Sequence, residues 1–351
     1  MEKIGICGHF AFGKNLKNGQ TIKGLTIYNC LKEKYGTEGL LVLDTRHFFY
    51  HFFTNLIRYI KMFNKCTDII IMPGKRGLFF FAPIGVLFKL KNKRVIHYIV
   101  IGGWLYSYLS KHKFLKFFVR KLDFIYVETN KMKADLEKIE IDNVTVVPNF
   151  KKIEPIKDDE ITKMDKNFIR VCTFSRVIKE KGIEIAAEAV SKANLQLECN
   201  VYHLDIYGQI EASYRDDFFK FLNQQKNCIS YCGEVESDDS INCLKNYFLL
   251  LFPTFYEGEG FPGTIIDAFS SGLPVIASDW KYNKEIICSD ECGYLLDENT
   301  SDCLAKKLID IYNNYELWER KKCKVLEISK NYYYKNLIEK ITNNFKIKES
   351  N

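Results

Sequence analysis

The sequence predicts an α/β protein of two domains, each built on an open, doubly wound parallel sheet. The chain has 351 residues, 47% of them hydrophobic, and this length exceeds what one ordinary hydrophobic core supports. Short apolar runs rich in β-branched residues alternate with helical stretches in two series, as in parallel βαβ units. Between the series lies a polar segment that is punctuated by Pro148 and Pro155 and lacks periodicity. We therefore expect domains at 1–150 and 151–330, separated by this linker.

Each domain is expected to hold a series of parallel strands, with helices between them. The runs of the first domain cover residues 3–7, 40–43, 68–72, 94–101, 124–128 and 144–147, and those of the second cover 169–174, 204–207, 229–232, 248–252, 274–277 and 293–296. Open parallel sheets bind their ligands at the carboxyl ends of the strands, so the loops that follow the strands should carry the chemistry.

The charge is unevenly distributed along the chain. The net charge is +7, but residues 1–150 hold 24 Lys and Arg against 11 Asp and Glu, which leaves 27 against 33 for the rest. A basic, aromatic-rich half suits an anionic membrane surface, a lipid phosphate or nucleic acid, although an ordinary solvated basic surface is the alternative. Because no RNA- or DNA-binding module is recognisable, we expect no nucleic-acid partner.

The cysteines and the N-terminus indicate the compartment. None of the twelve cysteines shows metal-like pairing, since Cys228 and Cys232, like Cys288 and Cys292, are separated by three residues. We expect reduced core thiols. The N-terminus lacks the basic start and apolar stretch of a secretory signal, and the apolar run 77–88 is far shorter than the roughly 20 residues that span a bilayer. The expected location is the cytoplasm.

The first strand leads into a glycine-containing loop that includes Gly8, His9 and Gly13, and a helix is expected from about Thr21. Glycines let the backbone approach a ligand, and main-chain amides at a helix N-terminus favour an anion. The glycine spacing does not match the dinucleotide-binding fingerprint. A plain strand-to-helix turn is therefore an equally good interpretation of this loop.

A second loop of the same kind opens the second domain. Arg176 and Lys181 bracket the segment between the run 169–174 and a helix from Ile183. Two cations beside a helix N-terminus could neutralise a diphosphate. The alternative is a solvated basic loop that ends at Gly182.

The segment after the buried run 248–252 has the most unusual composition. Residues 254–263 form a glycine-rich loop with two carboxylates, Glu257 and Glu259, and a short helix is expected from Thr264. Carboxylates accept hydrogen bonds from sugar hydroxyls, and main-chain amides suit a nucleotide diphosphate. For Asp267 an alternative role is a capping box with Thr264, three residues before it. For Glu259 the alternative is a solvated surface carboxylate.

With these residues in view, the chain resembles the family-4 retaining glycosyltransferases. Their hallmark is a glutamate, seven intervening residues and a second glutamate, followed by Gly-x-Pro-Val-Ile-Ala. Here Glu259 and Asp267 have that spacing, and 272–277 reads Gly-Leu-Pro-Val-Ile-Ala. Glu257 does not fit, because the matching position holds Ile265. Further matches span nearly the whole chain, at 18–20, 147–149, 174–182 and 204–208.

The resemblance implies the GT-B fold, in which two Rossmann-like domains face each other across a cleft, and a donor held mainly by the second domain. In that role Arg176 and Lys181 bind the phosphates, Glu259 lies near the sugar hydroxyls, and these three are the expected catalytic residues. Asp267 would bind the ribose. The full set of implied donor-binding positions is Gly13, Gly208, Gly260, Phe261, Pro262, Gly263, Thr264, Ile265 and Asp267.

The resemblance also implies an acceptor side in the first domain and a C-terminal helix, about 331–351, that crosses back to it. The candidate residues on the acceptor or sugar side are His9, Gln20, His97, Gly102 and Gly103. Many family members have a histidine near the reacting sugar at the end of the fourth strand. Here His97 stands five residues before Gly102, which favours a core histidine inside the strand over a place near the sugar. His9 is then the alternative residue for the wall of the site.

A second departure from the family is Asp267, which is one methylene shorter than glutamate. Its ribose contact is then either shifted or made through water.

The expected function is therefore transfer of a hexose-type sugar, with retention, from a nucleoside-diphosphate sugar (UDP or GDP) to a glycan or lipid-linked acceptor in cell-surface polysaccharide synthesis. No Asp-x-Asp occurs in the chain, and we expect no metal requirement and no cofactor. The alternatives are a sugar-nucleotide epimerase, a phosphorylase and a catalytically silent partner subunit of the same fold.

A membrane surface is a further expected partner. Residues 104–121 interleave aromatic and basic side chains, as an interfacial helix does. Peripheral docking on the inner face of the cell membrane is the expectation, and an ordinary helix packed on the sheet is the alternative.

Overall fold

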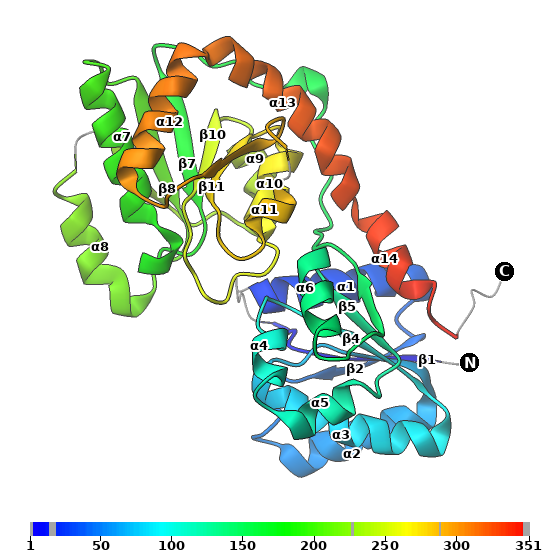
Figure 1. Ribbon diagram of the computed structural model, residues 1–351. Coiled ribbons are helices and arrows are strands. Elements are labelled where there is room, and N and C mark those ends of the chain that lie inside the picture. The colour runs from blue at the N-terminus through cyan, green and yellow to red at the C-terminus, as the bar shows by residue number, and fades with distance from the viewer. Residues whose placement is uncertain (1–2, 14–18, 226–227, 288, 347–351) are drawn as a thin grey trace. The chain divides into compact units, whose positions relative to one another are not determined.

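The structure is a computed structural model that describes residues 3–13, 19–225, 228–287 and 289–346. The chain divides into two compact units, which are Met1–Lys152 with Tyr333–Asn351, and Ile153–Tyr332 (Figure 1). Each unit contains one six-stranded sheet in which all pairings between named strands are parallel. The predicted fold class, two α/β units with parallel sheets, is confirmed.

The sheet of the first unit has the strand order β2-β1-β3-β4-β5-β6. A helical crossover follows each of the first five strands. In chain order the elements are β1 (Lys3–Gly8), α1 (Gly19–Tyr35), β2 (Leu40–Asp44), α2 (Phe52–Lys65), β3 (Cys66–Ile71), α3 (Lys75–Asn92), β4 (Val95–Ile99), α4 (Leu105–Leu109), α5 (Lys113–Val119), β5 (Phe124–Val127), α6 (Asn130–Glu137) and β6 (Val144–Val146).

Strand alternation sends the helices of the first unit to opposite faces of its sheet. Ile4 and Ile6 share a buried cluster with α1 and with α14 (Tyr334–Thr342). Gly5, between them, faces the other way, and a Cβ placed there would lie 2.8 Å from Met62 of α2. Since successive strand residues point to opposite faces, α1 and α14 cover one face and α2 packs on the other.

The sheet of the second unit has the order β12-β11-β10-β7-β8-β9. Its elements are η1 (Asp158–Glu160), β7 (Ile169–Phe174), η2 (Lys179–Lys181), α7 (Ile183–Gln196), β8 (Tyr202–Tyr207), η3 (Ala212–Tyr214), α8 (Arg215–Leu222), β9 (Ile229–Gly233), η4 (Ser237–Asp239), α9 (Ser240–Leu244), β10 (Leu249–Phe252), α10 (Gly263–Ser270), β11 (Val275–Ser278), α11 (Asn283–Ile286), β12 (Gly293–Leu296), α12 (Ser301–Asn313), α13 (Tyr315–Ser329) and η5 (Lys330–Tyr332).

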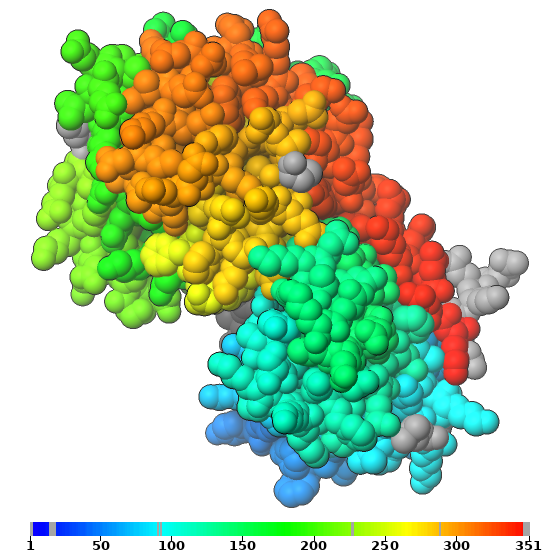
Figure 2. Space-filling view, in the orientation of Figure 1, coloured from blue at the N-terminus to red at the C-terminus, as the bar shows by residue number. Residues whose placement is uncertain are grey.

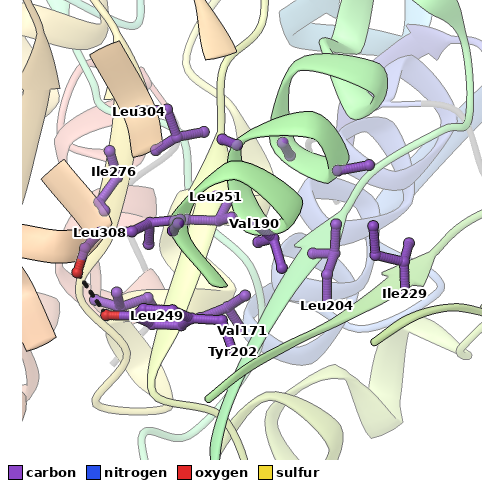
Figure 3. Packing of buried hydrophobic residues seen from close by; sticks show 14 of the residues in the cluster. Val171, Val190, Tyr202, Leu204, Ile229, Leu249, Leu251, Ile276, Leu304 and Leu308 are labelled. Carbon is purple, nitrogen blue, oxygen red and sulfur yellow. Dashed lines mark hydrogen bonds between the residues drawn. The ribbon is translucent and has the colours of Figure 1, made fainter. Parts of the chain in front are cut away.

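Two apolar clusters hold this second sheet between its helices. One lies under α7 and α12 and includes Val171, Val190 and Leu249 (Figure 3). Tyr202 belongs to it, and its hydroxyl donates a hydrogen bond of 2.7 Å to the carbonyl of Leu308. The other cluster lies around α10 and includes Phe269. The loops at the strand ends are therefore carried by a well-packed frame.

Several expectations are revised by the structure. The segment 104–121 is two short helices, α4 and α5, rather than one interfacial helix. The helix expected from Thr21 begins at Gly19, and Asn18 of the helix-start motif lies outside the described residues, as do Cys288 and the tail 347–351. Among the described cysteines six are buried, but Cys199, Cys232 and Cys323 are exposed, so those three are not core thiols.

The remaining question is whether a helix over 3–13, 19–225, 228–287 or 289–346 could span a bilayer. Within those ranges none combines the length and apolar character that a membrane-spanning helix needs.

Candidate functional site

Two loops at the carboxyl edge of the second sheet form the candidate site. One follows β7 and the other follows β10, and these strands are neighbours in the sheet. The loops are joined by main-chain contacts, because Phe255 N–H donates to the carbonyl of Glu180 at 2.8 Å. Gly182 has φ of +70°, and a Cβ there would lie 2.0 Å from the carbonyl oxygen of Pro253. Glycine is thus required for the loops to meet.

A buried ion pair connects the same two loops. The Lys181 Nζ atom lies 2.9 Å and 2.7 Å from the two carboxylate oxygens of Glu259. Lys181 is 8% exposed and Glu259 is 7% exposed. Burial lowers the pKa of Lys181, and the Glu259 carboxylate opposes this shift. The Thr254 hydroxyl donates to Glu259 at 3.4 Å, so the carboxylate is held in one orientation.

Tyr256 lies beside both cations of the site, a role that was not predicted from the sequence. The Arg176 guanidinium lies 5.4 Å from the centre of the Tyr256 ring, and Lys181 Nζ lies 5.2 Å from it. These are cation–π distances. The backbone carbonyl of Tyr256 accepts a hydrogen bond of 2.8 Å from the indole of Trp280. Arg176 itself is exposed, which leaves its guanidinium accessible to an anion.

The two glutamates of the glycine-rich loop have different environments. Glu257 forms an ion pair of 2.6 Å with Lys281, yet its side chain is 78% exposed. Glu259 is buried against Lys181. Of the two carboxylates, only that of Glu259 is therefore both buried and oriented by a buried cation.

The helix after the loop begins one residue before Thr264. The N-cap of α10 is Pro262, whose side chain makes no capping hydrogen bond. Thr264 is the second residue of α10, so the capping box between Thr264 and Asp267 is wrong. Asp267 is 1% exposed. The Thr264 Oγ1 atom is buried and has no hydrogen-bond partner among the described residues, which is costly unless a ligand supplies one.

The remaining donor-side positions lie close to these residues in the chain, except for two glycines. Phe261 is 7% exposed and packs on Tyr332 at a ring distance of 5.2 Å; Gly260, Pro262 and Ile265 are also buried. Gly208 has φ of +135°, and a Cβ there would lie 1.7 Å from the carbonyl oxygen of Ser175. Gly13 belongs to the first unit, with φ of +73°.

On the first unit, the candidate acceptor residues divide into two groups. His9 follows β1, and its Nδ1 atom is 2.9 Å from the Thr21 hydroxyl. Gln20 lies in the first turn of α1, and Gly102 and Gly103 follow β4. These four positions are at the carboxyl edge of the sheet.

His97 is in the second group, inside β4 and fully buried. Its ring nitrogens lie 3.0 Å from Asp68 and 3.1 Å from the Tyr126 hydroxyl, and the Phe345 ring is 4.8 Å away. The assignment of His97 to the acceptor or sugar side is therefore wrong, because no part of the side chain is exposed to a ligand. It is a core histidine that fixes the C-terminal segment.

A buried ion pair on the first unit was not predicted. Lys23 of α1 pairs with Glu128, which follows β5. They are 5% and 3% exposed. A lysine on the buried face of a helix could have indicated such a pair. Its partner is 105 residues away in the chain, so the pairing cannot be predicted without the fold.

Comparisons with known proteins agree with this geometry. Residues 155–325, within the second unit, match the family model described as glycosyl transferases group 1. An uncharacterized glycosyltransferase, MJ1069 of Methanocaldococcus jannaschii, is 22% identical over 284 residues, which cover 74% of this chain and 71% of the relative. The GtfA subunit of the UDP-N-acetylglucosamine–peptide N-acetylglucosaminyltransferase of Streptococcus agalactiae is 26% identical over 277 residues, 72% of this chain and 52% of the relative.

Among solved structures, Alr3699/HepE of Anabaena in complex with UDP superposes with a TM-score of 0.76 at 12% identity, covering 98% of this chain and 99% of that one. The structural relatives are GT-B glycosyltransferases, and this chain has the GT-B fold.

Proposed function

We propose that this chain is a retaining, metal-independent glycosyltransferase that moves a hexose-type sugar from a nucleoside-diphosphate sugar to a glycan or lipid-linked acceptor. The observation that carries the proposal is the buried Lys181–Glu259 pair beside Arg176, at the adjoining ends of β7 and β10. It combines cations for a diphosphate with an oriented carboxylate for sugar hydroxyls. The UDP bound in the HepE structure and the UDP-sugar named for the GtfA enzyme support uracil as the base.

The proposed chemistry depends on stabilising the leaving group. Departure of the nucleoside diphosphate places negative charge on its terminal phosphate oxygens. Arg176 and Lys181 neutralise that charge, and the first turn of α10 adds main-chain N–H groups. The Thr264 hydroxyl, for which the described residues offer no hydrogen-bond partner, donates to the same phosphate. No protein nucleophile is required in this scheme.

Glu259 acts on the sugar in this proposal. Its two oxygens are held by Lys181, so the carboxylate is already desolvated and oriented. When Lys181 turns to the phosphate, Glu259 accepts hydrogen bonds from the sugar hydroxyls. Asp267, buried in α10, is proposed to bind the ribose.

The acceptor is assigned to the carboxyl edge of the first sheet, around His9 and Gln20. We propose a glycan or lipid-linked acceptor of cell-surface polysaccharide synthesis, used at the inner face of the membrane. The basic first half, with 24 Lys and Arg against 11 acids over residues 1–150, supports an anionic surface near that edge.

Calorimetric titration with UDP tests the donor assignment. Arg176→Ala and Lys181→Ala should each weaken UDP binding by on the order of tenfold to 100-fold, since charge-assisted hydrogen bonds contribute about 1.5–3 kcal/mol each. Lys179→Ala is the matched control, because Lys179 lies in the same turn but is exposed. Unchanged affinity in both site variants would remove the phosphate assignment. Tight UDP binding without turnover on any sugar would indicate a silent partner subunit instead.

A further inference from the structure

One face of the first unit exposes an unusual number of large apolar side chains. Among the described residues, eight of the twelve exposed large apolar side chains fall between positions 45 and 122. Tyr50 is 88% exposed and Phe53 is 78% exposed. The full set is Phe49, Tyr50, Phe53, Ile57, Phe79, Leu87, Phe114 and Phe117. They lie on α2, α3 and α5 and on the turn before α2, and we call this surface the basic aromatic face.

Ring contacts show that the face is continuous. Phe80 of α3 lies 6.4 Å from Phe49 and 5.3 Å from Phe52, at the start of α2. On the neighbouring position of α3, Phe79 lies 5.2 Å from His112, in the turn between α4 and α5. Helix α3 packs against both α2 and α5, and their surfaces adjoin in blue and cyan on the first unit in Figure 2.

The charge of this part of the chain is almost entirely positive. Residues 45–122 contain 15 Lys and Arg and a single acid, Asp68, which is fully buried. The rest of the chain holds 36 basic and 43 acidic residues. At the border of the face, Asp123 pairs with Lys89 at 2.7 Å and Glu140 pairs with Arg120 at 3.0 Å. The face therefore presents cations around an apolar centre with no exposed acid of its own.

We propose that the basic aromatic face docks on an anionic lipid bilayer, with Phe49, Tyr50 and Phe53 entering the interfacial region and Arg58, Lys61 and Lys65 above them contacting the headgroups. Exposed aromatics with surrounding cations match a surface that is uniformly negative and apolar beneath. A folded protein partner would present both signs of charge and would favour a face with both.

The position of the basic aromatic face relates the docking to the proposed function. The turn 45–51 follows β2 and α3 begins after β3, so the turn and the first residues of α3 lie at the carboxyl edge of the first sheet, where His9 and Gln20 also lie. A bilayer under this edge brings lipid-linked acceptors to the loops that would bind them. The inference thus deepens the proposed function, on whose lipid-linked acceptor it rests.

Vesicle sedimentation with the full chain tests this docking. Vesicles of phosphatidylcholine alone are compared with vesicles containing phosphatidylglycerol, at low and high salt. We expect strong binding to the anionic vesicles, weakened by salt. The variant Phe49→Ser/Tyr50→Ser/Phe53→Ser should lose binding by more than tenfold, and Arg58→Gln/Lys61→Gln/Lys65→Gln by on the order of 100-fold.

The matched control is Leu195→Ser/Leu317→Ser, which removes two exposed leucines of the second unit and should bind as wild type does. Equal binding to neutral vesicles, full binding by the aromatic variant, or no vesicle binding at all would overturn the docking proposal. UDP affinity of each variant, measured in parallel, should stay unchanged. If the wild type did not bind UDP, the donor assignment alone would be refuted. Failure of the docking proposal and failure of the proposed function are therefore distinguishable.

Discussion

Removing the charge of Glu259 is the most informative single perturbation of the site. In Glu259→Gln the ammonium of Lys181, which is 8% exposed, loses the carboxylate that lies 2.7 Å away. Breaking a buried pair by removing one partner costs about 3–5 kcal/mol, because an uncompensated buried charge remains. We therefore expect the free energy of unfolding to fall by about that amount at pH 7.

The control for this change is Glu257→Gln, in the same loop. The Glu257–Lys281 pair is equally short, at 2.6 Å, but Glu257 is 78% exposed. Exposed pairs contribute under about 1 kcal/mol. Urea unfolding followed by tryptophan fluorescence should thus show a large loss for the first variant and a small one for the second.

The pH dependence of the same variant has a definite sign. Burial already lowers the pKa of Lys181, and the carboxylate that opposes the shift is absent in Glu259→Gln. Between the lowered pKa and the usual value of about 10.4, the unfolded chain binds more protons than the folded one. The stability of the variant should therefore rise with pH through this window, more steeply than that of the wild type. An equal loss in both glutamine variants, or a stability deficit that does not shrink with rising pH, would refute the reasoning.

Three further outcomes follow from the structure. Gly208→Ala should lower the free energy of unfolding by about 3 kcal/mol or more, since the new Cβ would lie 1.7 Å from a carbonyl oxygen. Thermal unfolding measures this loss, and Gly19→Ala is the control, because the space around Gly19 is open. Thr264→Val should leave stability almost unchanged but weaken UDP binding by about tenfold, seen by calorimetry. Asp68→Ala should lower the free energy of unfolding by about 3 kcal/mol, because Asp68 accepts hydrogen bonds from His97 and from the backbone N–H of Lys346. A urea midpoint equal to that of the wild type would contradict a stabilising role for these hydrogen bonds.

Much of the fold was predictable because parallel sheets leave a strong local signal. Their strands are short apolar runs buried on both faces, and the run 248–252 corresponds closely to β10. The glycine-rich loop was also identifiable, since Glu259 stands between two glycines.

The contacts within the site could not be predicted, because they depend on which strands become neighbours. Lys181 and Glu259 are 78 residues apart and meet only because β7 pairs with β10. Tyr256 has no signal in the sequence beyond being aromatic. Its role depends on both cations lying within reach of one ring.

Two of the wrong expectations have local causes. Helix α10 starts one residue before Thr264. Thr264 and Asp267 have the spacing of a capping box, but Thr264 lies inside the helix and not at its N-cap. The stretch 104–121 has a helical composition but breaks after Leu109 into α4 and α5. There the aromatic side chains differ in exposure: Tyr108 is half-buried and contacts His112 edge-on at a ring distance of 4.5 Å, while Phe114 is 64% exposed.

The most direct test of the central claim is the stereochemistry of turnover. The wild-type protein is incubated with a panel of UDP-α-sugars, and the released or transferred sugar is followed by proton NMR from the first minutes, with and without EDTA. The proposed mechanism predicts an α-configured product at the same rate in both samples, and loss of turnover in Lys181→Ala. A β-configured first product, or turnover that stops in EDTA, would contradict it.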